Sequence, residues 1–142
     1  MKKITSKVEP GKLLHIINRF DEIEGRTDVA PANQFIQLAT LRMEKGKTFR
    51  PHKHIWKPCP SPQIIAQESW VVIQGSVKIF MYDLDDTLLG TEVINQGDCS
   101  MTFEGGHTYE ILEENTVVYE YKTGPYQGVE NDKVFLEVGD VS

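Results

Sequence analysis

The chain has 142 residues, of which 39% are hydrophobic and 25% are charged, a composition that fits one globular domain and argues against disordered and fibrous classes. The formal net charge of −6 argues against the extended basic surface that nucleic-acid binding requires. The sequence has two cysteines without a CxxC pair, and it has neither a signal-like apolar segment nor a run long enough to cross a bilayer. We therefore expect a cytoplasmic protein that binds no nucleic acid and no membrane.

In chain order, short apolar runs and alternating patterns are interrupted by Gly, Asn, Asp and Pro, which is typical of β-strands. Residues 11–24 also carry apolar residues at helical spacing, so both a strand at 13–17 and a helix stay open there. The whole pattern predicts an all-β barrel or sandwich. The predicted strands are residues 13–17, 34–43, 48–54, 68–74, 76–82, 88–94, 98–103, 108–112 and 116–122, with a short edge strand at 133–137.

Residues 55–66 interrupt this pattern because they include three prolines, which cannot donate the hydrogen bonds of a central strand. We predict a long loop here, directly after a pair of histidines. Such a loop is either a lid or specificity element, or an insertion without function.

Histidine is scarce, yet His52 and His54 stand two residues apart in a predicted strand, so their imidazoles face the same side. Glu68 and His107 each open a later strand, and a carboxylate on the inner face of a barrel is costly unless it is paired or binds a metal. A lone His-x-His pair also occurs in surface loops. His15 has no such partner, and we expect it to be a structural or surface histidine. Three imidazoles and a carboxylate suit a divalent transition metal such as Zn, Fe, Mn or Ni.

Two motifs in this region resemble those of the cupin superfamily. The first runs from Gly46 through His52-Lys53-His54 to Glu68, which six residues separate from Gly75, and the second runs from Gly97 through Phe103-Glu104-Gly105-Gly106 to His107. The resemblance implies a double-stranded β-helix, or jelly roll, with one metal held by His52, His54, Glu68 and His107. The sequence departs from the motifs in having thirteen residues between His54 and Glu68, rather than three or four, and Phe103 in place of proline.

A closer resemblance is to the WbuC-type cupin metalloproteins. It is carried by Arg50-Pro51-His52-Lys53-His54 and by two C-terminal stretches, residues 118–126 and 131–135. This family is associated with bacterial surface-polysaccharide gene clusters. The resemblance implies a single cupin domain over residues 1–142, with an N-terminal arm at 1–33, a barrel core at about 34–123 and a C-terminal tail at 124–142. It also implies a homodimer.

Our first hypothesis is a metal-dependent isomerase or epimerase acting on a sugar, sugar phosphate or sugar-nucleotide intermediate. The alternatives are an iron-dependent oxygenase and a non-catalytic barrel that binds a sugar or effector. Glu104 is one further candidate base beside the fourth ligand. The residues predicted to act in catalysis are Glu110, Tyr109 and Tyr121, and those predicted to bind substrate are Arg50, Trp70 and Tyr119.

Overall fold

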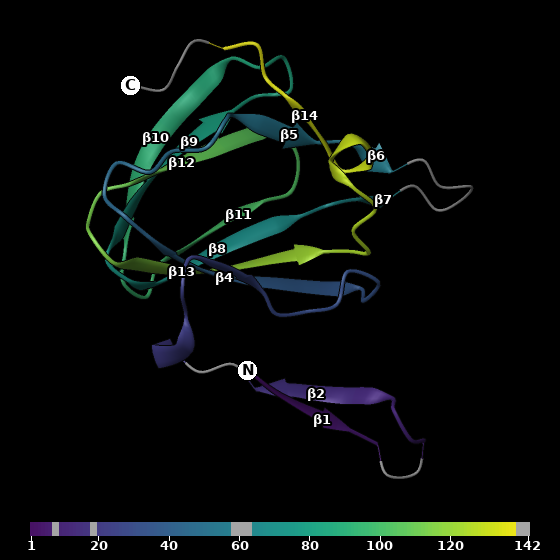
Figure 1. The fold of residues 1–142 in the computed structure, drawn as a ribbon. Coiled ribbons are helices and arrows are strands. Elements are labelled where there is room, and N and C mark those ends of the chain that lie inside the picture. Colours follow the sequence, from purple (N-terminus) through teal and green to yellow (C-terminus); the bar gives the residue numbers. More distant parts are fainter. Residues whose placement is uncertain (7–8, 18–19, 58–63, 139–142) are drawn as a thin grey trace.

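The computed structural model describes residues 1–6, 9–17, 20–57 and 64–138. Two five-stranded antiparallel sheets face each other across a common core (Figure 1). The first sheet has the spatial order β10 (Leu88–Asn95), β9 (Ser76–Tyr82), β12 (Gly106–Ile111), β5 (His52–His54) and β14 (Lys133–Phe135). The second has the order β11 (Cys99–Thr102), β8 (Glu68–Gln74), β13 (Thr116–Thr123), β4 (Ile36–Met43) and β3 (Arg26–Asp28).

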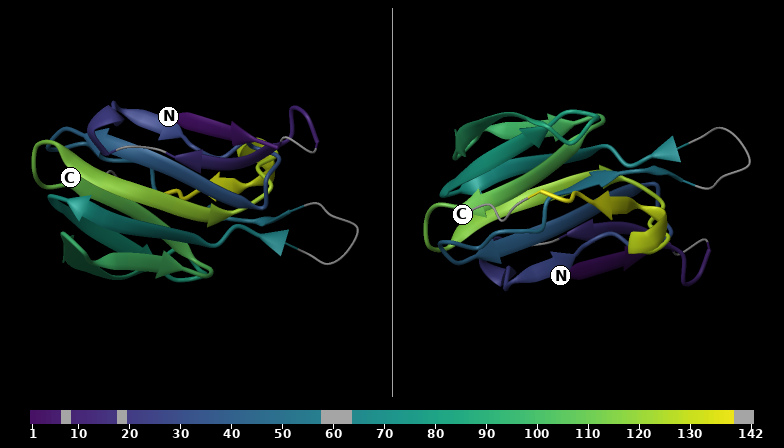
Figure 2. Two further views of the ribbon diagram at one scale, coloured as in Figure 1. Left: turned by 90° about the horizontal axis from the view of Figure 1, so that it is seen from below. Right: turned by 90° about the horizontal axis from the view of Figure 1, so that it is seen from above.

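Two small antiparallel pairs lie outside these sheets. Strands β1 (Lys2–Thr5) and β2 (Leu13–Ile17) form a hairpin to one side of the barrel, and β6 (Trp56–Lys57) pairs with β7 (Ile64–Ile65) in a projection from one end (Figure 2). Short 3-10 turns occupy Phe20–Glu22 (η1) and Val129–Asn131 (η2). In the described part of the chain, no helix is long and apolar enough to cross a membrane.

Alternation along β8 shows how the sequence builds the core. Glu68, Trp70 and Val72 are buried, whereas the residues between them are only partly buried, as expected for a strand with one face against a core. Val72 packs with apolar residues of the facing sheet, including Val77, Ile79 and Ile111. The inner face of β8 therefore passes from a carboxylate at its first residue to an aliphatic core farther along the strand.

The structure confirms the all-β prediction and corrects several boundaries. Residues 13–17 form a strand, so the helical alternative for 11–24 is wrong. β4 begins at Ile36 instead of residue 34, because the chain turns before it, with the Gln34 amide donating to the Pro31 carbonyl. β5 begins at His52 instead of residue 48, and only an isolated bridge between Thr48 and Glu110 precedes it.

The proline-containing segment is a loop in the sense that it leaves both large sheets. Its two ends nevertheless pair with each other, with Trp56 opposite Ile65, and residues 58–63 lie outside the described residues. Because β5 ends at His54 and β8 begins at Glu68, this hairpin is inserted between two of the predicted metal ligands. Strands β1 and β3 were not among the predicted elements.

Candidate metal centre

Both sheets contribute to one cluster of possible metal ligands. His52 and His54 come from β5, His107 from β12 and Glu68 from β8. His107 is directly opposite His52 in the β5–β12 ladder, and the ring centroids of these two histidines are 4.9 Å apart. One ligand atom from each of the four side chains lies within 4.8 Å of every other. The structure thus brings together the four residues that the sequence predicted as ligands.

The three imidazoles are held by their Nδ1 atoms. His52 Nδ1 is 3.1 Å from the carbonyl oxygen of Arg50, to which it can only donate, and His107 Nδ1 is 2.8 Å from the Thr102 hydroxyl. His54 Nδ1 is 3.1 Å from Oδ2 of Asp132, an ion-pair contact that is not aligned as a hydrogen bond. In each case Nε2 is the nitrogen left for an ion, and such outer partners fix both the tautomer and the ring orientation of metal-binding histidines.

Glu68 is the anion at the centre of the cluster. Its side chain is 4% exposed, with Oε2 3.0 Å from His54 Nε2 and Oε1 3.4 Å from His107 Nε2. Burial alone would raise the pKa of this carboxyl, but the contact with His54 and the nearby imidazoles hold it well below its usual range. Glu68 therefore stays ionised, as a ligand must.

The histidines differ in their proton affinity. Burial lowers the pKa of His52 to about 3, with the charge of Lys133 acting in the same direction, and burial also lowers the pKa of His107. Burial opposes protonation of His54 too, but its contacts with Asp132 and Glu68 raise its pKa above the ordinary value. His52 and His107 are therefore neutral at pH 7, whereas the raised pKa of His54 means that a proton competes with the ion for this imidazole.

The cluster fits a divalent transition metal. Nε2 of His107 is fully buried and has no hydrogen-bond partner among the described residues, which is costly unless something else occupies the position. Three imidazole nitrogens and one carboxylate oxygen are a donor set that suits borderline ions such as Zn, Fe, Mn or Ni.

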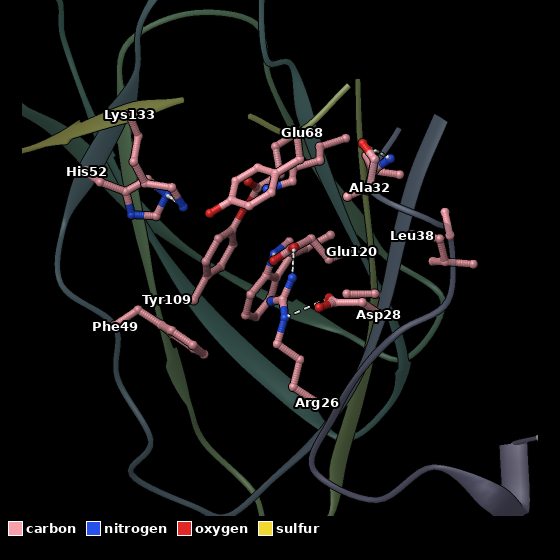
Figure 3. A pocket seen from close by; sticks show the side chains of 16 residues that line it. Arg26, Asp28, Ala32, Leu38, Phe49, His52, Glu68, Tyr109, Glu120 and Lys133 are labelled. Atoms are coloured by element: carbon pink, nitrogen blue, oxygen red, sulfur yellow. Dashed lines mark hydrogen bonds and ion pairs between the residues drawn. The ribbon is translucent and has the colours of Figure 1, made fainter. Parts of the chain in front are cut away.

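A cavity of about 340 Å³ adjoins the cluster, with His52 and Glu68 in its wall. Its opposite wall is built around Glu120 of β13, which accepts hydrogen bonds from the Arg26 guanidinium at 3.0 Å and from the Trp70 indole at 3.1 Å (Figure 3). Arg26 also donates to Asp28 at 3.0 Å. The remaining lining includes Phe49, Tyr109, Gln37, Lys122, Tyr126 and Lys133.

Aromatic rings separate this cavity from the aliphatic core. Trp70 and Tyr109 stack face to face, with centroids 3.8 Å apart and planes 2° from parallel, and Phe49 meets Trp70 edge-on at 5.5 Å. The Tyr109 hydroxyl is hydrogen-bonded to Ser100 at 3.0 Å. Burial raises the pKa of Tyr109 far above its ordinary value, so this phenol stays protonated at neutral pH.

Gly105 allows β12 to enter beside the site. Its φ is +86°, a conformation that other residues rarely adopt, and a Cβ there would lie 2.6 Å from the carbonyl oxygen of Tyr82. Gly106 and His107 follow immediately and pair with Tyr82 and Met81 of β9. A glycine is therefore required where the chain turns to present His107.

Only some of the other predicted site residues line the cavity. Trp70 and Tyr109 line the cavity, whereas Glu110, Tyr119 and Arg50 are not among its lining residues. Arg50 is exposed, with its guanidinium 4.4 Å from the centroid of the Phe135 ring. Glu104 is exposed, and Tyr121 lies in a separate, mainly apolar depression with Phe35, Ile36 and Met101.

Four residues near the ligands were missed by the sequence reasoning. Glu120 and Lys122 alternate with the predicted Tyr119 and Tyr121 on β13, so the inward face of that strand is the opposite of the one expected. Asp132 and Lys133 reach the site from the C-terminal tail. The inward direction of Glu120 follows from strand pairing. Glu120 is opposite Trp70 in the β8–β13 ladder, and residues paired across two strands share a face of the sheet.

No family model and no curated protein sequence matches the chain. Among solved structures, it is similar to KdgF from Halomonas sp., with a TM-score of 0.55 and 16% identity over 89% of this chain and 90% of that one. It is also similar to a double-stranded β-helix domain protein from Klebsiella pneumoniae subsp. pneumoniae, with a TM-score of 0.56 and 13% identity over 86% and 91% of the two chains. The chain has the cupin fold.

A third similar structure is the capsular polysaccharide assembling protein CapF from Staphylococcus aureus. The TM-score is 0.63 and the identity 18%, over 80% of this chain and 32% of the CapF chain. The cupin barrel described here thus corresponds to about a third of CapF. At these identities the likeness concerns the fold, and function must be argued from the site.

Proposed function

We propose that the protein is a metal-binding small cupin that takes a sugar or sugar derivative in the cavity beside one divalent ion. The observation that carries this proposal is the convergence of three imidazoles and a carboxylate, all within 4.8 Å, at the wall of a cavity of about 340 Å³. A volume of this order lies at the lower end of the range for small-molecule sites. A monosaccharide-sized ligand is therefore preferred over a larger one.

The lining supports a hydroxylated ligand. Glu120 and Asp28 supply carboxylate oxygens that accept hydrogen bonds, while Phe49 and Trp70 supply ring surface on which the apolar faces of a sugar can pack. CapF, whose name describes a capsular polysaccharide assembling protein, supports a setting in surface-polysaccharide synthesis. This agrees with the setting implied by the WbuC-type resemblance.

A bound divalent ion would act as a Lewis acid that polarises a carbonyl or hydroxyl group of the ligand. Around it, Glu120 is held in place by Arg26 and Trp70, so it can orient hydroxyl groups without a large rearrangement. Tyr109 keeps its proton and can only donate or share a hydrogen bond at neutral pH. If the reaction is an isomerisation or epimerisation, Glu120 is the candidate base among the described residues of the far wall.

The test is whether ligand binding depends on the metal. Protein prepared without an affinity tag would be stripped of metal, reloaded with Zn²⁺, Mn²⁺, Ni²⁺ or Fe²⁺, and titrated with a panel of monosaccharides and sugar phosphates by calorimetry. The proposal expects at least one ligand to bind only the loaded form. Equal binding to stripped and loaded protein, or no binding to either, would contradict it.

The same titrations separate the alternatives. Turnover of a bound sugar without oxygen uptake supports the isomerase or epimerase class, and oxygen uptake confined to the Fe²⁺-loaded form supports an oxygenase. Metal-dependent binding without turnover supports a non-catalytic sugar-binding module. All three share the metal site and differ in what the cavity does with its ligand.

We also propose a homodimer. The hairpin of β1 and β2 pairs with no other strand among the described residues, and an isolated two-stranded hairpin is at best marginally stable in water. Packing against a second copy would stabilise it. Light scattering after size exclusion should give twice the chain mass, and a monomer at micromolar concentration would remove this proposal.

A further inference from the structure

We propose that the ligand carries an oxyanion group, a carboxylate or a phosphate, that is held jointly by the bound ion and the ammonium group of Lys133, with its hydroxylated body directed toward Glu120 and Asp28. This inference rests on the proposed function and adds to it a class of ligand and a residue that selects it.

The position of Lys133 is the first observation. Its side chain lines the cavity, and its Nζ lies 3.4 Å from Nε2 of His52 (Figure 3). Because Nδ1 of His52 faces the Arg50 carbonyl, this Nε2 is the nitrogen that would bind the ion. A lysine ammonium so close to a ligand atom places two cations beside each other.

Lys133 has no carboxylate partner of its own. Among the described residues it forms no ion pair within 4.0 Å, although Lys53, Lys122 and Arg26 each do. The carboxylates of Glu68, Asp132 and Glu120 act on it only from longer range. A partly buried cation beside a metal is costly unless an anion lies between them, and no described side chain fills that role.

The charges around the cavity also favour an anionic group at the metal end of the ligand. At the metal end, Glu68 and Asp132 offset Lys122 and Lys133, so a divalent ion leaves two positive charges in excess there. At the other end, Glu120 and Asp28 outnumber Arg26, which they both contact.

A ligand that complements this polarity has its anionic group at the metal end and hydroxyl donors at the other. Glu120 is 9% exposed and Asp28 71% exposed, so the hydroxylated part of such a ligand would extend from the interior toward the mouth of the cavity. Neutral sugars satisfy the second requirement only, whereas sugar acids and sugar phosphates satisfy both.

The experiment uses the full chain loaded with Zn²⁺ and three matched probes, namely glucose, glucuronate and glucose 6-phosphate. The first two differ in a carboxylate at one carbon, and the third carries a phosphate there. A hydrogen bond to a charged group contributes enough to change affinity roughly 10- to 100-fold. We expect at least one anionic probe to bind roughly tenfold or more tightly than glucose, and the better of the two identifies the oxyanion.

Two variants test the role of Lys133. In Lys133→Met this preference for the anion should disappear, while the affinity for Zn²⁺ alone should rise severalfold, because a positive charge next to the ion has been removed. Lys133→Arg should keep the preference. Lys53→Met is the matched control, since Lys53 also lies in the first sheet but pairs with Asp86 at 2.6 Å, and it should leave both affinities unchanged.

The outcomes that overturn the inference are distinct from those that overturn the proposed function. Equal binding of glucose and the anions, no binding of either anion at 10 mM, a retained preference in Lys133→Met, or a fall in its Zn²⁺ affinity would each overturn the inference while the metal site stands. Failure of the wild-type protein to bind any of Zn²⁺, Mn²⁺, Ni²⁺ or Fe²⁺ would overturn both.

Discussion

Asp132 offers the most specific test of how the metal ligands are held. Its side chain is 1% exposed and its Oδ2 lies 3.1 Å from Nδ1 of His54 and 3.8 Å from Nζ of Lys122. A carboxylate in this position favours the tautomer that keeps its proton on Nδ1 and leaves Nε2 for the ion, and loss of such a partner typically lowers metal affinity 10- to 100-fold. Since each tenfold step corresponds to about 1.4 kcal/mol, removing Asp132 should cost roughly 1.4 to 2.8 kcal/mol of binding free energy.

The two substitutions at this position should differ. In Asp132→Asn the amide oxygen can still attract the Nδ1–H group, so we expect a loss near tenfold, whereas Asp132→Ala should approach 100-fold. The assay is competition for Zn²⁺ with a chromophoric chelator at pH 7.5. Asp86→Asn, which removes only the surface pair with Lys53, is the control and should change nothing.

A pH series separates positioning from a general loss of structure. Contact with Asp132 helps to raise the pKa of His54, so without the carboxylate His54 gives up its proton at lower pH. The pH below which metal affinity falls should therefore move downward in Asp132→Asn. A folded Asp132→Asn protein with wild-type affinity and an unshifted pH profile would refute the positioning role.

Three further predictions concern the barrel, its titration and its ligand. In urea unfolding, Gly105→Ala should lower the free energy of unfolding by about 1 to 3 kcal/mol more than Gly46→Ala. Both glycines have φ near +85°, but only at Gly105 does an added Cβ meet a carbonyl oxygen, and equal losses would contradict this. Between pH 7 and 5, the free energy of unfolding of the metal-free protein should fall by up to about 2 kcal/mol because of His52. In the unfolded chain this histidine takes up a proton below pH 6.5, but in the folded protein only near pH 3. An equally steep fall in His52→Asn would contradict this prediction. Glu120→Gln should weaken sugar binding to the loaded protein roughly fivefold or more, whereas Glu110→Gln, outside the cavity, should not, as titration calorimetry would show.

The clustering of the four candidate ligands could be predicted from the sequence because their positions follow local rules. Spacing of two on β5 puts His52 and His54 on one face, and Glu68 begins a strand whose alternate residues, Trp70 and Val72, are evidently core. The long segment of thirteen residues between His54 and Glu68 did not disturb this, because β6 and β7 pair with each other and return the chain to the start of β8.

The far wall could not be predicted because the usual hydrophobic signal is inverted there. On β13 the aromatic residues Tyr119 and Tyr121 face away from the cavity, and the charged Glu120 and Lys122 line it. Inward-facing polar residues are stabilised by long-range partners, in this case Arg26 of β3 for Glu120. Nothing local to β13 reveals those partners.

Arg50 illustrates a different limit. It was predicted to bind substrate, which requires it to face inward like His52 two residues later, but the ladder of β5 begins only at His52 and Pro51 precedes it. The alternation of inward and outward side chains applies only within a strand. Asp132 and Lys133 were missed for a related reason, since the C-terminal tail enters the site only by pairing with β5, where Lys133 is opposite His54.

The most direct test of this account is the metal content of the protein. Elemental analysis of tag-free protein, after exposure to a mixture of Zn²⁺, Mn²⁺, Ni²⁺ and Fe²⁺ and removal of the unbound ions, would be made on the wild type, on His52→Ala combined with His54→Ala, and on His15→Ala as a histidine control from β2. The account predicts about one ion per chain in the wild type and in His15→Ala, and almost none in the double variant. A folded wild-type protein that retains no ion, or a double variant that retains as much as the wild type, would contradict it.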